Sequence, residues 1–332
     1  MSAWPQKPMS IGQILDRTFT MYRKHFGKFF LLMLIFFAPL YVIQEMMLND
    51  IASLSMLPDG SADPLSGEYL NNLDGSTDFA NGWLAVLFLV LIIPLTFLVS
   101  TPISTATVVY MVKAQMDGRE VNMKEGIKRA FGRFWPLAGS TIVYGLIAFA
   151  MVLAIVLFIA VIAGIIAAIG VGSLGELGFE QLFSDPATLI VGGVLSFILF
   201  LVLLLVPGYF LIRWGFFMPA VAMEAGGIGL KQSWNLTKGN FWRVLAVYIV
   251  IILMTTVFTI AFQMITLFVL PNSIIGLLVQ NLLTLLISPL ALIAYAFTYF
   301  DLQLRREGTD LEALIMPESS DQLAEESIVK DE

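Results

Sequence analysis

Ten lysine and arginine side chains lie close to the start of three long apolar segments in this 332-residue chain. Ammonium and guanidinium groups bind phosphate through charge-assisted hydrogen bonds, so this pattern could bind an anionic lipid or another phosphorylated ligand. Topology alone also predicts such residues, because positive charges are retained on the cytoplasmic side of a membrane during insertion. Topology with interfacial anchoring is the favoured interpretation, and anionic-lipid contact is the alternative. The candidate contacts are Arg23, Lys24, Lys28, Lys124, Lys128, Arg129, Arg133, Lys231, Lys238 and Arg243.

Two further ionisable residues, Arg213 and Glu224, could lie at membrane depth. Arg213 ends an apolar run, and Glu224 follows 11 residues later, after further apolar sequence. This spacing is close to three helical turns, so the two side chains could share a helix face and belong to one polar network without pairing directly. Ionisable residues inside a membrane often mark function. In the favoured alternative, Arg213 lies at the cytoplasmic boundary and its guanidinium snorkels to water.

The sequence offers little else for catalysis or metal binding. It contains no cysteine, and His25 is its only histidine, which excludes disulfides, thiol nucleophiles and thiolate metal sites. The acidic segment 49–81 lacks the spacing of a calcium loop, and the glycine-rich "EAGGIG" lacks the Lys-Ser/Thr ending of a phosphate loop. We therefore predict that the protein is not an enzyme, that it has no metal or cofactor, and that its partners are membrane lipids rather than nucleic acid.

Long apolar segments must position these residues. Hydrophobic residues make up 58% of the chain and charged residues 13%, whereas roughly a quarter of the residues in a soluble protein are charged. Six segments are apolar over lengths suited to crossing a bilayer, and the first is the shortest. We therefore predict an all-α integral membrane protein with six transmembrane helices. The segments are residues 29–43, 83–112, 137–171, 188–212, 241–270 and 273–300.

The sign of the charge alternates along these segments. All 18 lysine and arginine residues belong to the N-terminal arm, to the stretches that follow the second and fourth segments, or to the C-terminal tail. The stretches that follow the first and third segments contain aspartate and glutamate but no lysine or arginine. Both termini are therefore predicted to be cytoplasmic, and the protein to lie in the cytoplasmic membrane.

A short motif recurs three times, each time before an apolar segment. The copies are "KHFGKFFLLML", "AFGRFWPLAG" and "TKGNFWRVLA", with glycines at positions 27, 132 and 239, which are 105 and 107 residues apart. Because each copy precedes two spans, the repeats should be parallel, with units 9–113, 114–222 and 223–304. The helical periodicity before the glycine predicts an amphipathic helix in the cytoplasmic interface. The glycine is predicted to lie at the corner where this surface helix ends and the chain turns into the spanning helix.

Prolines mark the second span of each unit, and neutral polar residues occur in the second, fifth and sixth spans of the chain. Proline removes a helical hydrogen bond, so kinks are expected, which shape the bundle or, alternatively, form a gate. Serine and threonine are expected to hydrogen-bond between helices, with a polar pathway as the alternative. Such residues include Ser104 and Thr107 in the second span and Thr284 and Ser288 in the sixth. Residues 305–332 are acidic and poor in aromatic residues, which predicts a disordered cytoplasmic tail. The prolines are Pro94, Pro102, Pro207 and Pro289.

Three segments carry a resemblance to a known family: "SIGQILDRTFTMYRKHFGKF", "PAVAMEAGGIGLKQSWNLTKGNFWRVL" and "YFDLQLRREGTDLEALI". From about Met9 to Leu314 the chain resembles the membrane domain found at the N-terminus of some bacterial glycerophosphoryl diester phosphodiesterases. In two-part members of that family, a separate soluble domain performs metal-assisted hydrolysis with paired histidines and carboxylates. The resemblance therefore implies a bacterial six-span module without that activity, and no catalytic residue carries over to this chain.

The combined expectation is a non-enzymatic, multi-pass protein of the bacterial cytoplasmic membrane. It would act as a membrane anchor, a scaffold or a lipid-associated accessory protein. The alternative is a permease or lipid translocator that uses the proline-kinked helices.

Overall fold

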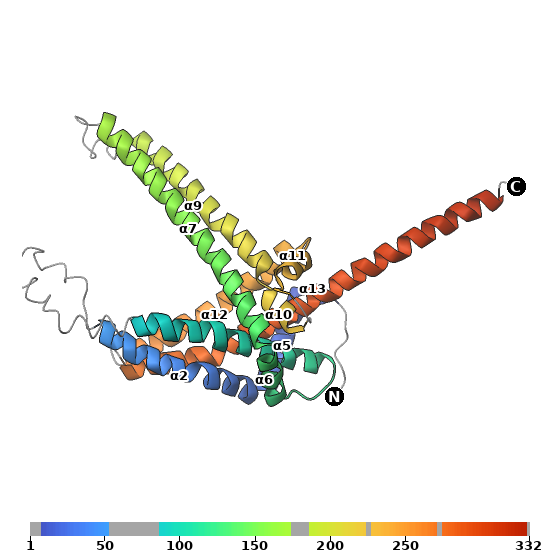
Figure 1. The fold of residues 1–332 in the computed structure, drawn as a ribbon, viewed down its shortest axis with the longest axis horizontal. Coiled ribbons are helices and arrows are strands. Elements are labelled where there is room, and N and C mark those ends of the chain that lie inside the picture. Colours follow the sequence, from blue (N-terminus) through green and yellow to red (C-terminus); the bar gives the residue numbers. More distant parts are fainter. Residues whose placement is uncertain (1–7, 53–85, 174–185, 224–226, 271–273, 331–332) are drawn as a thin grey trace, which may run out of the picture.

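The computed structural model describes residues 8–52, 86–173, 186–223, 227–270 and 274–330, and all regular elements in these ranges are helices (Figure 1). Short helices alternate with long ones. In chain order they are α1 (Ile11–Lys24), α2 (Phe26–Ala52), the π-helical segments η1 (Phe88–Ile92) and η2 (Leu95–Ser100), α5 (Thr101–Met116), α6 (Met123–Gly132), α7 (Phe134–Ser173), α9 (Pro186–Trp214), α10 (Phe217–Met223), α11 (Leu230–Thr237), α12 (Phe241–Val269) and α13 (Ile274–Lys330).

Within the described ranges, six stretches are long and apolar enough to cross a membrane. Each overlaps one of the six predicted segments, so the prediction of an all-helical protein with six candidate spans is confirmed. Their lengths, 20 to 34 residues, reach or exceed the roughly 20 residues that a bilayer requires. The stretches are Phe26–Glu45, Phe88–Met116, Phe134–Val161, Phe197–Met223, Phe241–Val269 and Ile275–Gly308.

The long helices form two groups (Figure 1). Helices α2, α5, α12 and α13 lie side by side as a bundle, and α13 packs against the other three and against α1. Phe29, Ile103 and Phe297 are fully buried in this bundle. Helices α7 and α9 lie along each other and diverge from the bundle toward their far ends. Side chains such as Phe149 of α7 and Phe197 of α9 are more than half exposed, as expected for helices that face lipid.

Each of α2, α7 and α12 follows a short helix, and the residue directly before each long helix has similar backbone angles. These residues are His25 (φ −121°, ψ 25°), Arg133 (φ −115°, ψ 23°) and Asn240 (φ −116°, ψ 18°). The predicted glycine corner is corrected in the first two units, because Gly27 lies in the first turn of α2 and Gly132 is the last residue of α6. In the third unit Gly239 does lie in the turn between α11 and α12. Any residue can adopt the corner angles, so glycine is not required there. Of the three motif glycines, only Gly239 has a positive φ, 83°.

The C-terminal tail differs from its prediction. Residues 305–332 were expected to be disordered, whereas α13 continues as one helix as far as Lys330 (Figure 1). Adding a residue to an existing helix costs far less than starting a new one. The tail contains six glutamates and three leucines, residue types that favour helix. Low aromatic content therefore does not by itself prevent helix here.

The prolines of the bundle lie where the helical hydrogen-bond ladder is altered. Pro94 separates the two π-helical segments η1 and η2. Pro289 lies inside α13 and leaves the carbonyl oxygen of Leu285 without its usual helical donor. The Ser288 hydroxyl donates to that oxygen over 3.2 Å, so a neighbouring side chain replaces the missing amide.

Candidate functional site

Charged side chains gather at one end of the bundle, which we call the basic end. It is formed by α1, α6 and α11 and by the first turns of α2, α7 and α12 (Figure 1). Two buried charged sites and two basic cavities occur there. A fifth site, a cavity lined by hydroxyl groups, lies deeper in the bundle.

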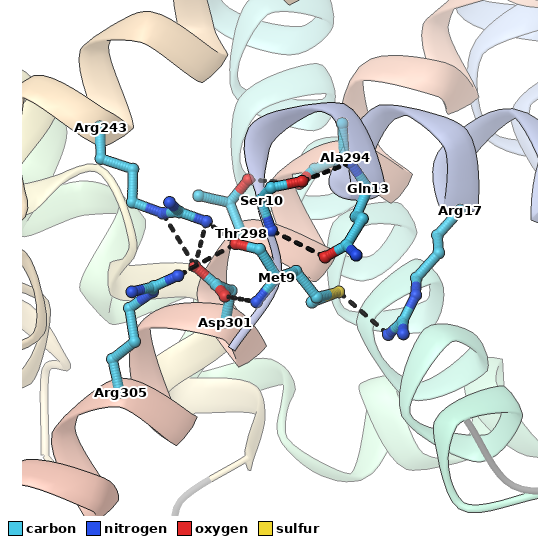
Figure 2. A network of polar contacts seen from close by, with 9 residues as sticks. All are labelled: Met9, Ser10, Gln13, Arg17, Arg243, Ala294, Thr298, Asp301 and Arg305. Atoms are coloured by element: carbon cyan, nitrogen blue, oxygen red, sulfur yellow. Dashed lines mark hydrogen bonds and ion pairs between the residues drawn. The ribbon is translucent and has the colours of Figure 1, made fainter. Parts of the chain in front are cut away.

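Asp301 is the centre of the first buried site (Figure 2). Its carboxylate is fully buried, and one of its oxygens accepts hydrogen bonds from the Nε atoms of Arg243 and Arg305, both over 3.0 Å. The other oxygen accepts the backbone N–H of Met9 over 2.6 Å. The carbonyl oxygen of Met9 in turn accepts from both guanidiniums. The carboxylate therefore joins α12, α13 and the segment before α1.

Sequence reasoning did not single out Asp301, because the sixth predicted span ended one residue earlier, at Phe300. A carboxylate next to a span end looks like an ordinary boundary residue. A usable signal was present, since Arg305 follows at the i+4 position, where a helix brings two side chains together. The contributions of Arg243 and Met9 come from distant sequence and depend on the fold.

Arg213 is the centre of the second buried site, between the end of α9 and α11. Its guanidinium donates to the Tyr209 hydroxyl over 2.7 Å and to the carbonyl oxygen of Trp234 over 3.1 Å. The guanidinium carbon lies 3.8 Å from the centre of the Trp234 ring, a favourable cation–π geometry. Among the described residues these partners are all uncharged, so dipoles and an aromatic face stabilise the charge.

Two interpretations of Arg213 came from the sequence. Its side chain is only 8% exposed and its donors bind protein atoms, so the favoured interpretation, a guanidinium extended into water, does not fit the structure. The guanidinium does not extend into water, because the rings of Tyr209 and Trp234 pack against it. Glu224, the other member of the proposed network, lies outside the described residues.

The ten candidate lipid contacts divide into two groups. Three bind atoms of the protein itself: Lys28 donates to the carbonyl oxygen of Val121 over 2.6 Å, Arg133 to that of Val221 over 3.0 Å, and Arg243 belongs to the Asp301 site. The other seven are exposed, and one of them, Arg129, forms an ion pair with Glu125. The exposed residues are Arg23, Lys24, Lys124, Lys128, Arg129, Lys231 and Lys238.

The first basic cavity lies between α5, α6 and α10 and has a volume of about 520 Å³. Four basic side chains and no acidic side chain are found in its described lining. Two carboxylates lie just outside it, since Asp117 pairs with Lys113 and Arg119, and Glu125 pairs with Arg129. A third carboxylate, Glu120, borders Arg119 and Arg129 in the adjoining cavity, so the four positive charges outnumber the nearby negative ones by one. The lining residues are Tyr110, Lys113, Arg119, Arg129, Gly132, Arg133, Ala222 and Met223.

The pKa of Asp117 reflects the positively charged side chains around it. Partial burial alone would raise the pKa of its carboxyl, but the hydrogen bond from Arg119 and the charge of Lys113 outweigh burial and hold the pKa below its ordinary value. The carboxylate is thus charged at neutral pH and orients the two basic side chains at the rim of the cavity.

The second basic cavity lies between the start of α12 and α13, with a volume of about 680 Å³. Lys238, Arg305 and Arg306 contribute positive charge, and its described lining also contains no acidic side chain. Asn240, which precedes the first turn of α12, lines the cavity, and its side chain makes no capping hydrogen bond to the amides of that turn. Uncapped amides at a helix N-terminus favour anions. Both cavities therefore offer donors and positive charge at a corner of the chain.

The fifth site, which we call the hydroxyl cavity, has a volume of about 330 Å³ and lies between α2, α5, α12 and α13. No ionisable acid or base lines it in the described structure; its polar groups are eight hydroxyls, six of which donate to carbonyl oxygens of their own helices. Ser104, Thr284 and Ser288, singled out from the sequence, all belong to it, whereas Thr107 lies elsewhere. The hydroxyl residues are Tyr41, Thr101, Ser104, Thr105, Thr255, Thr259, Thr284 and Ser288.

These features define a multi-pass helical membrane protein with charged sites at one end of its bundle. The chain belongs to a family described as a domain of unknown function, DUF7847, whose model matches residues 30–303. No curated protein and no solved structure matches the chain. Within the described ranges, no group of three or more histidine, cysteine, aspartate or glutamate side chains could hold a metal ion.

Proposed function

We propose that this protein is a non-enzymatic, lipid-associated protein of the cytoplasmic membrane that binds anionic lipid headgroups at its basic end. It would serve as an anchor, a scaffold or an accessory to other membrane proteins. The resemblance to a bacterial six-span membrane domain points the same way.

The first basic cavity is the observation that carries the proposal. A phosphate group offers several acceptor oxygens, and Arg119 and Arg129 supply fork-shaped donors at the rim of the cavity. Its volume of about 520 Å³ accommodates a headgroup, within the range of about 300 to 1,000 Å³ usual for ligand pockets. The excess of positive charge favours an anion.

The position of the cavity agrees with a headgroup layer. Trp135 and Trp242 begin the spans that follow the corners of α7 and α12, and they are 81% and 78% exposed. Tryptophan is enriched at the boundary between lipid and water. Because cytoplasmic leaflets carry anionic lipids and cytoplasmic loops carry positive residues, we assign the basic end and both termini to the cytoplasm.

We also propose that the chain consists of three parallel repeats, each introduced by an amphipathic interfacial helix, α1, α6 or α11. Support comes from the corners: Arg133 and Asn240 have nearly the same backbone angles and are separated by the same 107 residues as the second and third motif glycines. In the first unit, His25 lies two residues before its glycine rather than one after, so that copy has diverged.

The test compares two double variants of the same charge. Arg119→Gln/Arg129→Gln removes donors from the cavity, whereas Lys124→Gln/Lys128→Gln removes exposed charges from α6 outside it. Both are purified in native-membrane discs, and the bound lipids are quantified by mass spectrometry. The proposal predicts that the cavity variant loses most of the enrichment of anionic lipid and that the control retains it. Equal losses would mean a diffuse electrostatic attraction without a site.

A permease or lipid translocator is the second candidate, and the hydroxyl cavity is the observation that favours it. Because the chain contains no cysteine, single cysteines at Ser104, Thr284 and Ser288 can report water access, with Thr107→Cys as a buried control outside the cavity. Labelling of the three cavity positions by a water-soluble thiol reagent, with Thr107→Cys unlabelled, would favour a pathway. If the cavity positions stay unlabelled, a water-lined pathway through these helices is excluded.

A further inference from the structure

The hydroxyl cavity contains polar groups that the protein itself does not satisfy. Thr105 is 2% exposed and lines the cavity, and its hydroxyl forms no hydrogen bond with any described residue. Tyr41 on the facing helix, α2, is half-buried, lines the cavity too, and its hydroxyl also forms no hydrogen bond with a described residue. Neither hydroxyl oxygen is among the described side-chain atoms that protein atoms seal off without a partner, so both face the open space of the cavity. A polar group without a partner is costly in an apolar environment, and most such groups in folded proteins have one. A ligand in the cavity would supply one.

The cavity lies well inside the membrane. Thr105 is 11 residues from the end of α5 at Met116, about 16 Å along a helix, and Thr255 is 14 residues from the start of α12. Half of a hydrocarbon core of about 30 Å is a similar distance. A molecule in this cavity is therefore surrounded by helices and lipid chains at the depth where water is scarce.

The lining determines the charge of the occupant. An ion at this depth needs a counter-charge, and the described lining has only hydroxyl, aromatic and aliphatic groups. Six hydroxyls have their protons directed to carbonyl oxygens of their own helices and so present lone pairs, whereas Thr105 and Tyr41 can still donate. The cavity thus suits an uncharged group that both accepts and donates hydrogen bonds, or accepts alone.

The size of the cavity limits how much of the ligand it holds. Its volume of about 330 Å³ corresponds to about ten water molecules at the density of the liquid, which is enough for a headgroup or a ring but not for acyl chains. Because Met33, Phe37 and Leu292 also line it, a lipid could place its polar group against the hydroxyls and its first carbons against these side chains.

We propose that the hydroxyl cavity binds the uncharged polar group of a membrane lipid, a class that includes diacylglycerols and isoprenoid quinones. Thr105 and Tyr41 donate to its oxygen atoms, and its hydrocarbon chains extend into the surrounding bilayer. This site is independent of the anionic-lipid site at the basic end, because the two cavities share no lining residue.

The experiment uses the full chain in lipid discs with a diazirine-bearing diacylglycerol as the probe. After illumination, the cross-linked peptides are identified by mass spectrometry, and unlabelled diacylglycerol, ubiquinone or phosphatidylglycerol is added as competitor. We expect labelling of α5 and α13 next to the cavity, competition by at least one of the two uncharged lipids, and none by phosphatidylglycerol. The stronger competitor identifies the natural class.

Matched variants locate the binding. Thr105→Val keeps the shape of the side chain and removes one donor, and we expect labelling to fall about fivefold, with a larger fall when Tyr41→Phe is added. Thr107→Val is the control, because Thr107 is also buried on α5 but donates to Ile103 within its own helix and does not line the cavity. Ala291→Phe should abolish labelling by filling the space.

Three outcomes would overturn the proposal. The first is equal labelling of Thr105→Val/Tyr41→Phe and Thr107→Val, and the second is displacement of the probe by phosphatidylglycerol as well as by uncharged lipids. The third is no labelling of the cavity peptides, which would mean that no lipid enters the cavity. Thermal unfolding of each variant identifies those that fail to fold. Retention of anionic lipid is measured in the same preparations, so a failure of this site is distinguishable from a failure of the basic cavity.

Discussion

The Asp301 site and the Arg213 site both hold guanidinium groups at the basic end, half-buried at the first and buried at the second, but they stabilise them in different ways. At the Asp301 site, two arginines share one fully buried carboxylate (Figure 2). At the Arg213 site, the described partners of the guanidinium are the hydroxyls of Tyr209 and Thr237, the Trp234 carbonyl oxygen, and the rings of those two aromatic residues. The first is an ionic site and the second a dipolar one.

The two sites also differ in the distance along the sequence that they bridge. Met9 and Arg243 are 292 and 58 positions from Asp301, whereas Trp234 is 21 positions from Arg213. The Asp301 site therefore holds the N-terminal segment, α12 and α13 in one arrangement. The Arg213 site stabilises the local turn from α9 through α10 to α11. A change at the first should act on the whole bundle, and a change at the second on one corner.

Asp301→Asn is expected to have the largest effect. It leaves two guanidiniums beside a neutral side chain, and breaking a buried ion pair from one side costs about 3 to 5 kcal/mol. Unfolding of the purified protein in lipid discs measures the loss, and hydrogen exchange should show a newly exposed Met9 amide. Glu307→Gln is the control, because Glu307 is exposed and its described bond is to Gln303 on the same helix. A loss no larger than that of the control would contradict the assignment.

Arg213→Lys is expected to have an intermediate effect, about 2 kcal/mol. Lysine keeps the charge but loses the planar fork and most of the stacking on Trp234. The amides of α10 and α11 should exchange faster while the Met9 amide remains protected. Arg23→Lys, on the exposed side of α1, is the matched control. Faster exchange at Met9 as well would show that the two sites form one cooperative unit.

His25 is expected to give the smallest effect, at the corner between α1 and α2. Burial lowers the pKa of its imidazole, the hydrogen bond with Gln115 opposes this, and the nearby Lys28 and Lys24 add to the lowering. The folded protein thus binds fewer protons than the unfolded chain between that lowered pKa and the ordinary value of about 6.5. Stability should be full above pH 6.5 and decline as the pH falls below it.

Thermal unfolding of the wild type and of His25→Gln across this pH range tests that dependence. The variant should show a flatter profile between about pH 7 and pH 5. If both proteins lose stability in parallel, another titrating group is responsible.

The sequence was sufficient to predict the six spans and the charge asymmetry, because length, hydropathy and charge are local properties. It could not predict the partners of Asp301, since Met9 and Arg243 reach it only after the bundle has formed. The first two corners were misplaced by one or two residues: the change of direction lies at His25 rather than Gly27, and at Arg133, directly after Gly132.

The candidate sites were foreseen in part. Arg129 and Arg133 were chosen from charge alone, and both line the first basic cavity, but Lys113 and Arg119 join them from the end of α5 and the turn that follows it. Ser104, Thr284 and Ser288 were noted as polar residues of separate spans, and only their packing reveals a shared cavity. A cavity depends on which faces of the helices meet, and that information is distributed over the whole chain.

A structure of the full chain determined in lipids of its own membrane would test the central claim most directly. We predict a phosphate group within hydrogen-bonding distance of Arg119 and Arg129 in the first basic cavity, and its loss in Arg119→Gln/Arg129→Gln but not in Lys124→Gln/Lys128→Gln. If that cavity holds no phosphate although anionic lipid remains bound at other surfaces of the protein, the account of the basic end as a headgroup site is contradicted.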